Sequence, residues 1–172
     1  MNLSDKPDEV TCSYCKRKMA AVGLPKTRDA ALPASMVSGI EVVIEAARGS
    51  PRWSGGKPSP AHYGYIRRVG SAEGATEWMD CFVGPNAYAD RAFIVDMYRR
   101  DNFAFDEHKV MLGFDSMEDA VKAVQVAYHD LDIGPKDITP VSISNLRLWL
   151  RGGNHSAPYY TPPQGELFGR AA

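Results

Sequence analysis

Residues 108–131 read HKVMLGFDSMEDAVKAVQVAYHDL, and this stretch decides the fold class because its hydrophobic period changes in the middle. The run from His108 to Gly113 is short, apolar and followed by turn residues, which predicts a strand. Ser116 and Asp119 then form a variant of the capping box, a pattern that starts helices. Behind it, apolar residues recur at helical spacing: Met117, Ala120, Val121, Val124, Ala127, Tyr128 and Leu131. The stretch therefore predicts a strand followed directly by a helix.

The chain before this stretch predicts strands, and the chain after it predicts one more helix. Strand-like runs separated by Gly, Pro, Asn and Asp lie at 40–46, 63–67, 79–83 and 92–98. Gly134-Pro135 ends the first helix, and a second, short helix is indicated by Ile143, Leu146, Trp149 and Leu150, with Gly152 as its cap. Several short strands followed by helices indicate an α+β fold with a small antiparallel barrel or curled sheet.

The two ends of the chain differ from this central region. Residues 1–38 show little periodicity and predict a flexible or loosely docked N-terminal extension. Cys12 and Cys15 form a CxxC there, but tetrahedral zinc needs four ligands, so free thiols or a degenerate ribbon is the better interpretation. Residues 152–172 are rich in Gly and Pro and predict a tail without regular elements. The predicted domain is therefore 39–151.

The composition argues against several classes of protein. The chain has 172 residues, 44% of them hydrophobic, with 20 Lys and Arg against 21 Asp and Glu. This balance is not typical of a protein that coats nucleic acid or an anionic membrane. The longest apolar stretches, such as 124–128, are too short to span a bilayer, and the polar start has no signal core. Three cysteines cannot all pair with one another, so we expect a cytoplasmic protein rather than a secreted disulfide scaffold.

Acidic residues gather beside the predicted strands and turns: Glu45, Glu77, Asp80, Asp101, Asp106 and Glu107. If the strands are neighbours, these acids converge on one end of a sheet, and oxygen-only clusters suit hard cations such as Mg²⁺ or Mn²⁺. Basic residues lie between them, and Arg offers a planar fork that matches phosphate: Arg52, Lys57, Arg67, Arg68, Lys109 and Arg147. On spacing alone, solvated acids that pair with nearby bases are the more common explanation.

Four motifs follow one another in a fixed order. They are Tyr-Gly-Tyr-Ile at 63–66, Cys-Phe-Val-Gly-Pro at 81–85, FDEHKVMLGF at 105–114 and Trp-Leu at 149–150. In this order they resemble the pyrophosphatase-like domain of bacteriophage and mobile-element proteins, which is related to the family I soluble inorganic pyrophosphatases. The resemblance covers about residues 39–151.

The resemblance implies a five-stranded OB-like antiparallel β-barrel with two C-terminal helices packed outside. It also implies Mg²⁺-dependent hydrolysis of a phosphoanhydride, most simply pyrophosphate to two phosphates, by metal-activated water, with Mn²⁺ as a second metal. The metal carboxylates it indicates are Glu73, Glu77, Asp80, Asp106 and Glu107. The substrate contacts it indicates are Arg52, Tyr63, Lys109, Tyr128 and His129, with Glu45 as an outer acid. Asp80, Glu107, Lys109 and Tyr63 carry the catalytic roles in this interpretation.

Two positions depart from the family pattern. The family's acidic loop opens Asp-Gly-Asp, whereas this chain has Glu73-Gly74-Ala75, so either Ala75 replaces an aspartate or an insertion lets Glu73 stand in for it. His129 stands where the family has a lysine. The alternative hypothesis is therefore a catalytically weakened binding or accessory module of a phage or mobile element. The expected partner is pyrophosphate or a related small phosphoanhydride, with no membrane and no strong nucleic-acid signal, and a homo-oligomer is left open.

Overall fold

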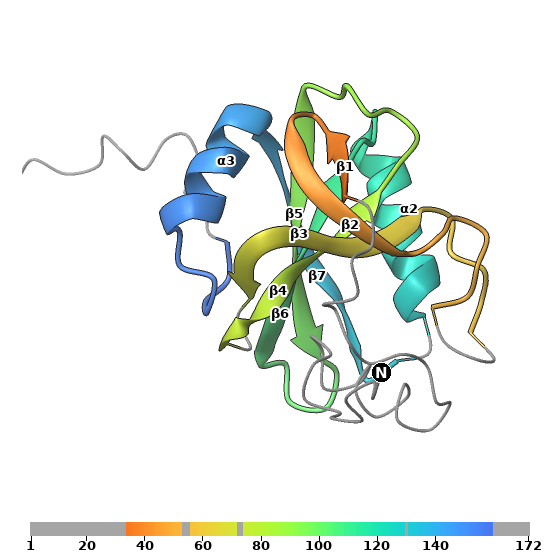
Figure 1. The fold of residues 1–172 in the computed structure, drawn as a ribbon. Helices are drawn as coiled ribbons and strands as arrows, with labels where there is room; N and C mark the ends of the chain where they lie inside the picture. The colour runs from red at the N-terminus through yellow and green to blue at the C-terminus, as the bar shows by residue number, and fades with distance from the viewer. Residues whose placement is uncertain (1–33, 53–55, 72–73, 130, 160–172) are drawn as a thin grey trace, which may run out of the picture.

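Seven strands form one sheet in this computed structural model, which describes residues 34–52, 56–71, 74–129 and 131–159. The strands are β1 (Ala34–Val37), β2 (Ile40–Ala46), β3 (His62–Ser71), β4 (Gly74–Val83), β5 (Arg91–Arg99), β6 (Phe105–Leu112) and β7 (Ile133–Ser142). Helix α2 (Met117–Tyr128) lies between β6 and β7 in the sequence, and α3 (Ile143–Gly152) follows β7 (Figure 1). Among the helices of the described residues, none is long and apolar enough to cross a membrane.

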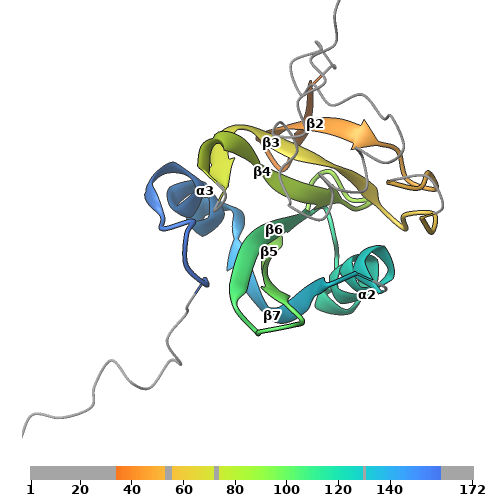
Figure 2. The ribbon, with the colours of Figure 1, turned by 90° about the horizontal axis from the view of Figure 1, so that it is seen from below.

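The strand order is β1-β2-β3-β4-β6-β5-β7, and neighbouring strands are antiparallel except for β4 and β6. The parallel pairing of Cys81–Val83 with Val110–Leu112 joins an antiparallel half, β1 to β4, to a second antiparallel half, β6-β5-β7. Figure 2 shows these two halves curling over one another, with α2 and α3 on opposite sides of the sheet.

The α+β class and the two predicted helices are confirmed, whereas the five-stranded closed barrel is wrong. The sheet is open, with β1 and β7 at its edges. The expected helix end at Gly134-Pro135 is wrong, because α2 ends at Tyr128 and these two residues lie in the missed strand β7, which also contains Pro140. An edge strand tolerates proline because one side of its backbone needs no ladder partner, and among the described strands β7 pairs with β5 alone. The sheet also begins before residue 39, because β1 lies in the segment assigned to the N-terminal extension.

Two clusters of buried apolar side chains lie on the two faces of the sheet. One lies between the sheet and α2, which buries Ala120, Ala123, Val124, Ala127 and Tyr128. The other lies on the α3 side, where Leu146 and Leu150 pack against residues of the strands. The predicted cap is present, because the Ser116 side chain accepts a hydrogen bond from the Asp119 backbone N–H at 3.1 Å. Alternation along each strand sends neighbouring side chains to opposite clusters, and this alternation positions the site described next.

Candidate active site

Three strands and the end of α2 bring one group of polar side chains together. Tyr63 lies on β3, Asp80 on β4, and Glu107 and Lys109 on β6. Tyr65 is the register partner of Asp80, so Tyr63, two residues away on the same face of β3, reaches Asp80 diagonally. The parallel register of β4 and β6 places Asp80 beside Lys109. All these side chains lie on the face of the sheet that α2 covers.

Lys109 lies between two carboxylates. Its Nζ atom is 2.5 Å from Asp80 Oδ2 and 2.6 Å from Glu107 Oε2. The Tyr63 hydroxyl donates a hydrogen bond to the same oxygen of Asp80. Asp80, Glu107 and Lys109 are each 0% exposed. We call these four residues, together with Arg52 and Tyr128, the buried cluster.

Arg52 enters the buried cluster from the segment that precedes β3 and is held by aromatic rings. Its guanidinium carbon lies 3.6 Å from the centre of the Tyr63 ring and 4.8 Å from that of Tyr128. Phe82 packs edge-on against both tyrosines and completes the apolar wall. A planar guanidinium stacked on aromatic rings is fixed in orientation, because the rings favour its flat face.

The buried charges shift the pKa values of two members of the cluster. Burial opposes the charged form of Lys109, but Asp80 and Glu107 outweigh it and hold the lysine pKa well above its ordinary value. Burial raises the pKa of Tyr63 well above its ordinary value; the nearby cation Arg52 opposes the shift and the Asp80 charge adds to it. Lys109 is therefore an ammonium and Tyr63 a neutral phenol across the physiological range.

Asp106 lies at the edge of the cluster, in an irregularity of β6. Met97 pairs with Glu107 and Tyr98 pairs with Phe105, so Asp106 is an extra residue that has no opposite partner on β5. Its Oδ2 atom is buried and has no hydrogen-bond partner in the described residues. Burial raises the pKa of this carboxyl, although Lys109 and Arg99 pull it back. Asp106 is thus a partly buried carboxyl, close enough to Lys109 for the lysine charge to act on its pKa.

The donor set is suited to a hard cation, but it is incomplete in the part of the chain that the structure describes. Asp80 and Glu107 present carboxylate oxygens to a single positive charge, as ligands of Mg²⁺ do. No group of three or more His, Cys, Asp or Glu that could hold a metal ion is found among the described residues. Of the other predicted ligands, Glu73 and the side chain of Glu77 lie outside the described part of the chain. Asp106 is the remaining predicted ligand whose side chain the structure describes.

Two predicted site residues lie outside the buried cluster. Glu45 is exposed at the irregular end of β2, next to the position where Ala46 pairs with Tyr63. His129 is exposed at the C-terminal cap of α2, directly after Tyr128. The structure thus brings together Arg52, Tyr63, Asp80, Glu107, Lys109 and Tyr128, and places Asp106 beside them. The predicted Cys12-Cys15 pair lies outside the described residues.

A second buried polar pair was not predicted from the sequence. Asp96 on β5 and His108 on β6 are register partners, and both are buried. The signal was present, because Asp96 is the single acid in the apolar strand RAFIVDMYR, and a buried acid needs a partner.

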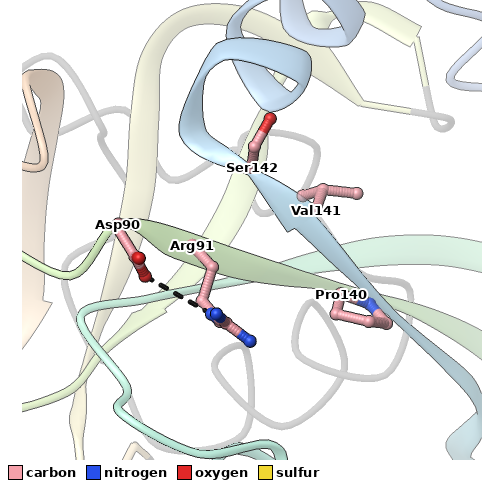
Figure 3. A pocket seen from close by; sticks show the side chains of 5 residues that line it. All are labelled: Asp90, Arg91, Pro140, Val141 and Ser142. Atoms are coloured by element: carbon pink, nitrogen blue, oxygen red, sulfur yellow. Dashed lines mark hydrogen bonds and ion pairs between the residues drawn. The ribbon is translucent and has the colours of Figure 1, made fainter.

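Two open hollows lie away from the cluster. One, of about 270 Å³, is lined by Asp90, Arg91, Pro140, Val141 and Ser142 (Figure 3), and Asp90 and Arg91 form an ion pair of 3.3 Å in it. The other, of about 240 Å³, is lined by the β5–β6 turn and the start of β7. Neither contains a residue of the buried cluster.

Comparison with known proteins gives one finding. The family model described as Inorganic Pyrophosphatase matches residues 32–151. No curated protein and no solved structure gives a significant match. The matched region contains every residue of the buried cluster and ends one residue before α3 does.

Proposed function

The chain belongs to the inorganic pyrophosphatase family, and on this premise we propose that it hydrolyses a phosphoanhydride, inorganic pyrophosphate in the first place, with Mg²⁺. The observation that carries the proposal is the contact of Lys109 with both Asp80 and Glu107 in a fully buried position. Burying charged groups costs free energy that well-packed apolar residues would not cost. A cluster of two acids and two bases under α2 is therefore better explained by chemistry than by stability.

The two cations of the cluster supply the means to bind phosphate. Lys109 is a point charge, and the raised pKa keeps it protonated at neutral pH. Arg52 offers a planar fork of donors, and its contacts with the rings of Tyr63 and Tyr128 hold the guanidinium in place before substrate arrives. Pre-organised cations bind an anion without a further ordering cost. In the proposed function, Arg52 and Lys109 orient the substrate phosphates.

The carboxylates of the cluster supply oxygen ligands. Asp80 and Glu107 would hold Mg²⁺, with Asp106 and the acids of the β3–β4 region, Glu73 and Glu77, as further donors. When bound, a divalent cation lowers the pKa of water and neutralises charge on phosphate oxygens. Tyr63 donates to Asp80 and so keeps one carboxylate oxygen in place. The protein's own task in this scheme is to hold the substrate and its carboxylates in a fixed arrangement.

A second candidate function rests on the same contact. Lys109 already neutralises Asp80 and Glu107 without a metal ion, and Ala75 stands in the acidic loop where the family has an aspartate or where an insertion has shifted the loop. A chain with these two features could bind phosphate compounds without cleaving them. In that case it is an accessory module rather than an enzyme.

Phosphate release from pyrophosphate separates the two candidates. The enzyme releases phosphate with Mg²⁺ or Mn²⁺ and stops when EDTA removes the metal. No release above buffer at micromolar protein, together with calorimetric binding of pyrophosphate, would select the binding module. No release and no binding would reject both. A cytoplasmic location, an origin in a phage or mobile element and a homo-oligomeric state stay predictions.

A further inference from the structure

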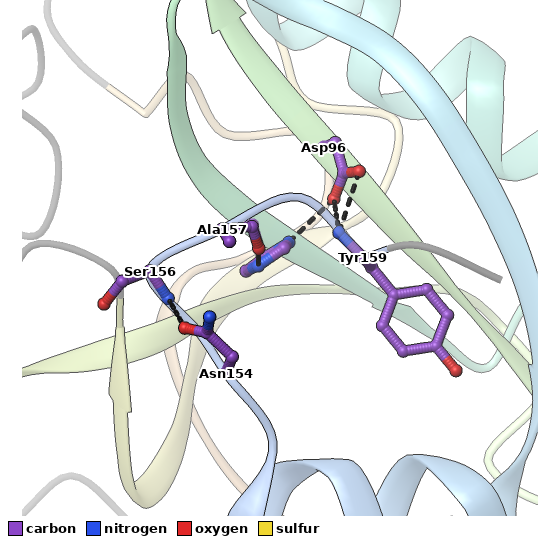
Figure 4. Close-up of polar contacts among 6 residues, drawn as sticks. Asp96, Asn154, Ser156, Ala157 and Tyr159 are labelled. Carbon is purple, nitrogen blue, oxygen red and sulfur yellow. Dashed lines mark hydrogen bonds and ion pairs between the residues drawn. The ribbon is translucent and has the colours of Figure 1, made fainter.

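The chain after α3 crosses the far face of the sheet, opposite the buried cluster. Residues 154–159, which we call the C-terminal strap, lie beyond the region that matches the family model. The strap runs along β5 and β6, and Figure 4 shows its backbone next to Asp96. Family membership therefore does not account for this segment.

Asp96 and His108 hold the backbone of the strap. The His108 Nδ1 atom lies 2.8 Å from Asp96 Oδ1, and its Nε2 atom lies 2.9 Å from the Ala157 carbonyl oxygen. The Tyr159 backbone N–H donates to both oxygens of Asp96, at 3.1 and 3.0 Å (Figure 4). A carbonyl and an N–H of the strap are thus fixed by two side chains that are 2% and 0% exposed.

Aromatic packing and a second histidine fasten the rest of the strap. The Trp149 ring of α3 packs edge-on against His108, His155 and Tyr159, with centroid distances of 5.0, 4.6 and 5.4 Å. The His155 ring nitrogens lie 3.0 Å from the Gly70 carbonyl oxygen and 3.1 Å from that of Trp149. The strap is therefore attached to β3, β5, β6 and α3 at once.

His108 connects the strap to the buried cluster. It stands between Glu107 and Lys109 on β6, and successive side chains of a strand point to opposite faces. Glu107 and Lys109 therefore lie on the face where Lys109 contacts Asp80, while His108 is anchored on the other face. Because the three residues are consecutive in β6, the contacts that hold His108 in place also limit how far Glu107 and Lys109 can move. Misplacing a reacting group by about 1 Å can cost on the order of 10²-fold in rate.

We propose that the C-terminal strap, through Asp96 and His108, positions Glu107 and Lys109 for the reaction. Asp96, His108 and the strap are positioning residues, because none of them reaches the cluster itself. The kinetic consequences rest on the proposed function, whereas the positioning of β6 does not.

The test compares Asp96→Ala with a matched variant, Leu146→Ala, in the full chain. Leu146 is fully buried on the same side of the sheet but makes no polar contact with the strap, so its truncation lowers stability without releasing His108. We expect Asp96→Ala to lower kcat by about tenfold or more and to raise the Mg²⁺ concentration at half-maximal rate. Leu146→Ala should lower Tm and leave that Mg²⁺ concentration unchanged. Asp96→Asn keeps an acceptor for the Tyr159 N–H and should restore most of the rate.

Amide hydrogen exchange gives a readout that does not depend on hydrolysis. In Asp96→Ala, and in a chain that ends after Gly153, the amides of residues 106–110 should exchange faster than in the wild type. In Leu146→Ala they should follow only the global loss of stability. A wild-type chain that releases no phosphate would overturn the proposed function, and the exchange data would still decide the role of the strap. Equal exchange at 106–110 in Asp96→Ala and Leu146→Ala would overturn the positioning proposal.

Discussion

Replacing Lys109 by methionine should cost a large part of the stability of the fold. The substitution keeps an unbranched side chain, shorter by one atom, and removes the charge that lies 2.5 Å from Asp80 and 2.6 Å from Glu107. All three side chains are 0% exposed, so two carboxylates would be left buried and facing each other. Removing one partner of a buried ion pair costs about 3–5 kcal/mol. With a urea slope of about 2 kcal/mol per M, a loss of ~4 kcal/mol moves the unfolding midpoint by about 2 M.

Urea unfolding followed by circular dichroism measures this shift. Lys122→Met is the matched control, because Lys122 is exposed on α2 and its charge should contribute within about 0.5 kcal/mol. Adding Asp80→Asn to Lys109→Met removes one of the two negative charges that repel each other and should recover part of the lost stability. Mg²⁺ should also raise the midpoint of Lys109→Met more than that of the wild type, since only the variant lacks the ammonium between the two carboxylates. A Lys109→Met midpoint equal to that of Lys122→Met would refute the buried ion pair.

Three further predictions concern the same region. The free energy of unfolding should fall as pH rises above about 10. In the unfolded chain Lys and Tyr release their protons there, whereas folded Lys109 and Tyr63, whose pKa values are raised, still hold theirs. An unfolding midpoint that stays constant from about pH 9 to about pH 11 would contradict this prediction. Tyr63→Phe keeps the ring under Arg52 but removes the hydrogen-bond donor to Asp80. It should lower the free energy of unfolding in urea by about 1.5–3 kcal/mol. A loss under about 0.5 kcal/mol would reject that hydrogen bond. Gly64→Ala should destabilise the sheet by about 1–3 kcal/mol or more, because the added Cβ would lie 1.8 Å from the Val43 carbonyl oxygen. Gly152→Ala is the control, because a Cβ there meets nothing within 4 Å. Equal urea midpoints for the two variants would contradict this prediction.

The elements with a clear hydrophobic periodicity in the sequence could be predicted, whereas the strands at the two edges of the sheet could not. Helix α2 carries both a cap and a helical apolar face, and its predicted start agrees with the structure. Strand β7 carries two prolines, and nothing in the sequence alone shows that it lies at an edge where proline is tolerated. Strand β1 has four residues, too few for a period to show. The closed barrel was therefore an error of strand count at both edges.

The candidate site could be predicted as a set of residues but not as an arrangement. The order of the motifs pointed to Tyr63, Asp80, Glu107 and Lys109. The first and last of these are 46 residues apart in the chain, and the fold joins the four through consecutive contacts. That Lys109 bridges the two carboxylates depends on the parallel pairing of β4 with β6, a tertiary feature without a local signal. The Asp96–His108 pair was missed because its partner, the strap, contains Pro158 and forms neither a helix nor a strand, so it has no periodic signal.

Phosphate release from pyrophosphate, compared between Asp80→Asn and Asp90→Asn, decides whether the buried cluster is the active site. Asp80 is fully buried between Tyr63 and Lys109, whereas Asp90 is an exposed acid that pairs with Arg91. Both variants lose one carboxylate charge and keep their size, so only the place of the charge differs. We expect Asp80→Asn to abolish Mg²⁺-dependent release while circular dichroism shows a folded chain, and Asp90→Asn to release phosphate at the wild-type rate. An Asp80→Asn protein that hydrolyses pyrophosphate as fast as Asp90→Asn would contradict the assignment of the buried cluster as the active site.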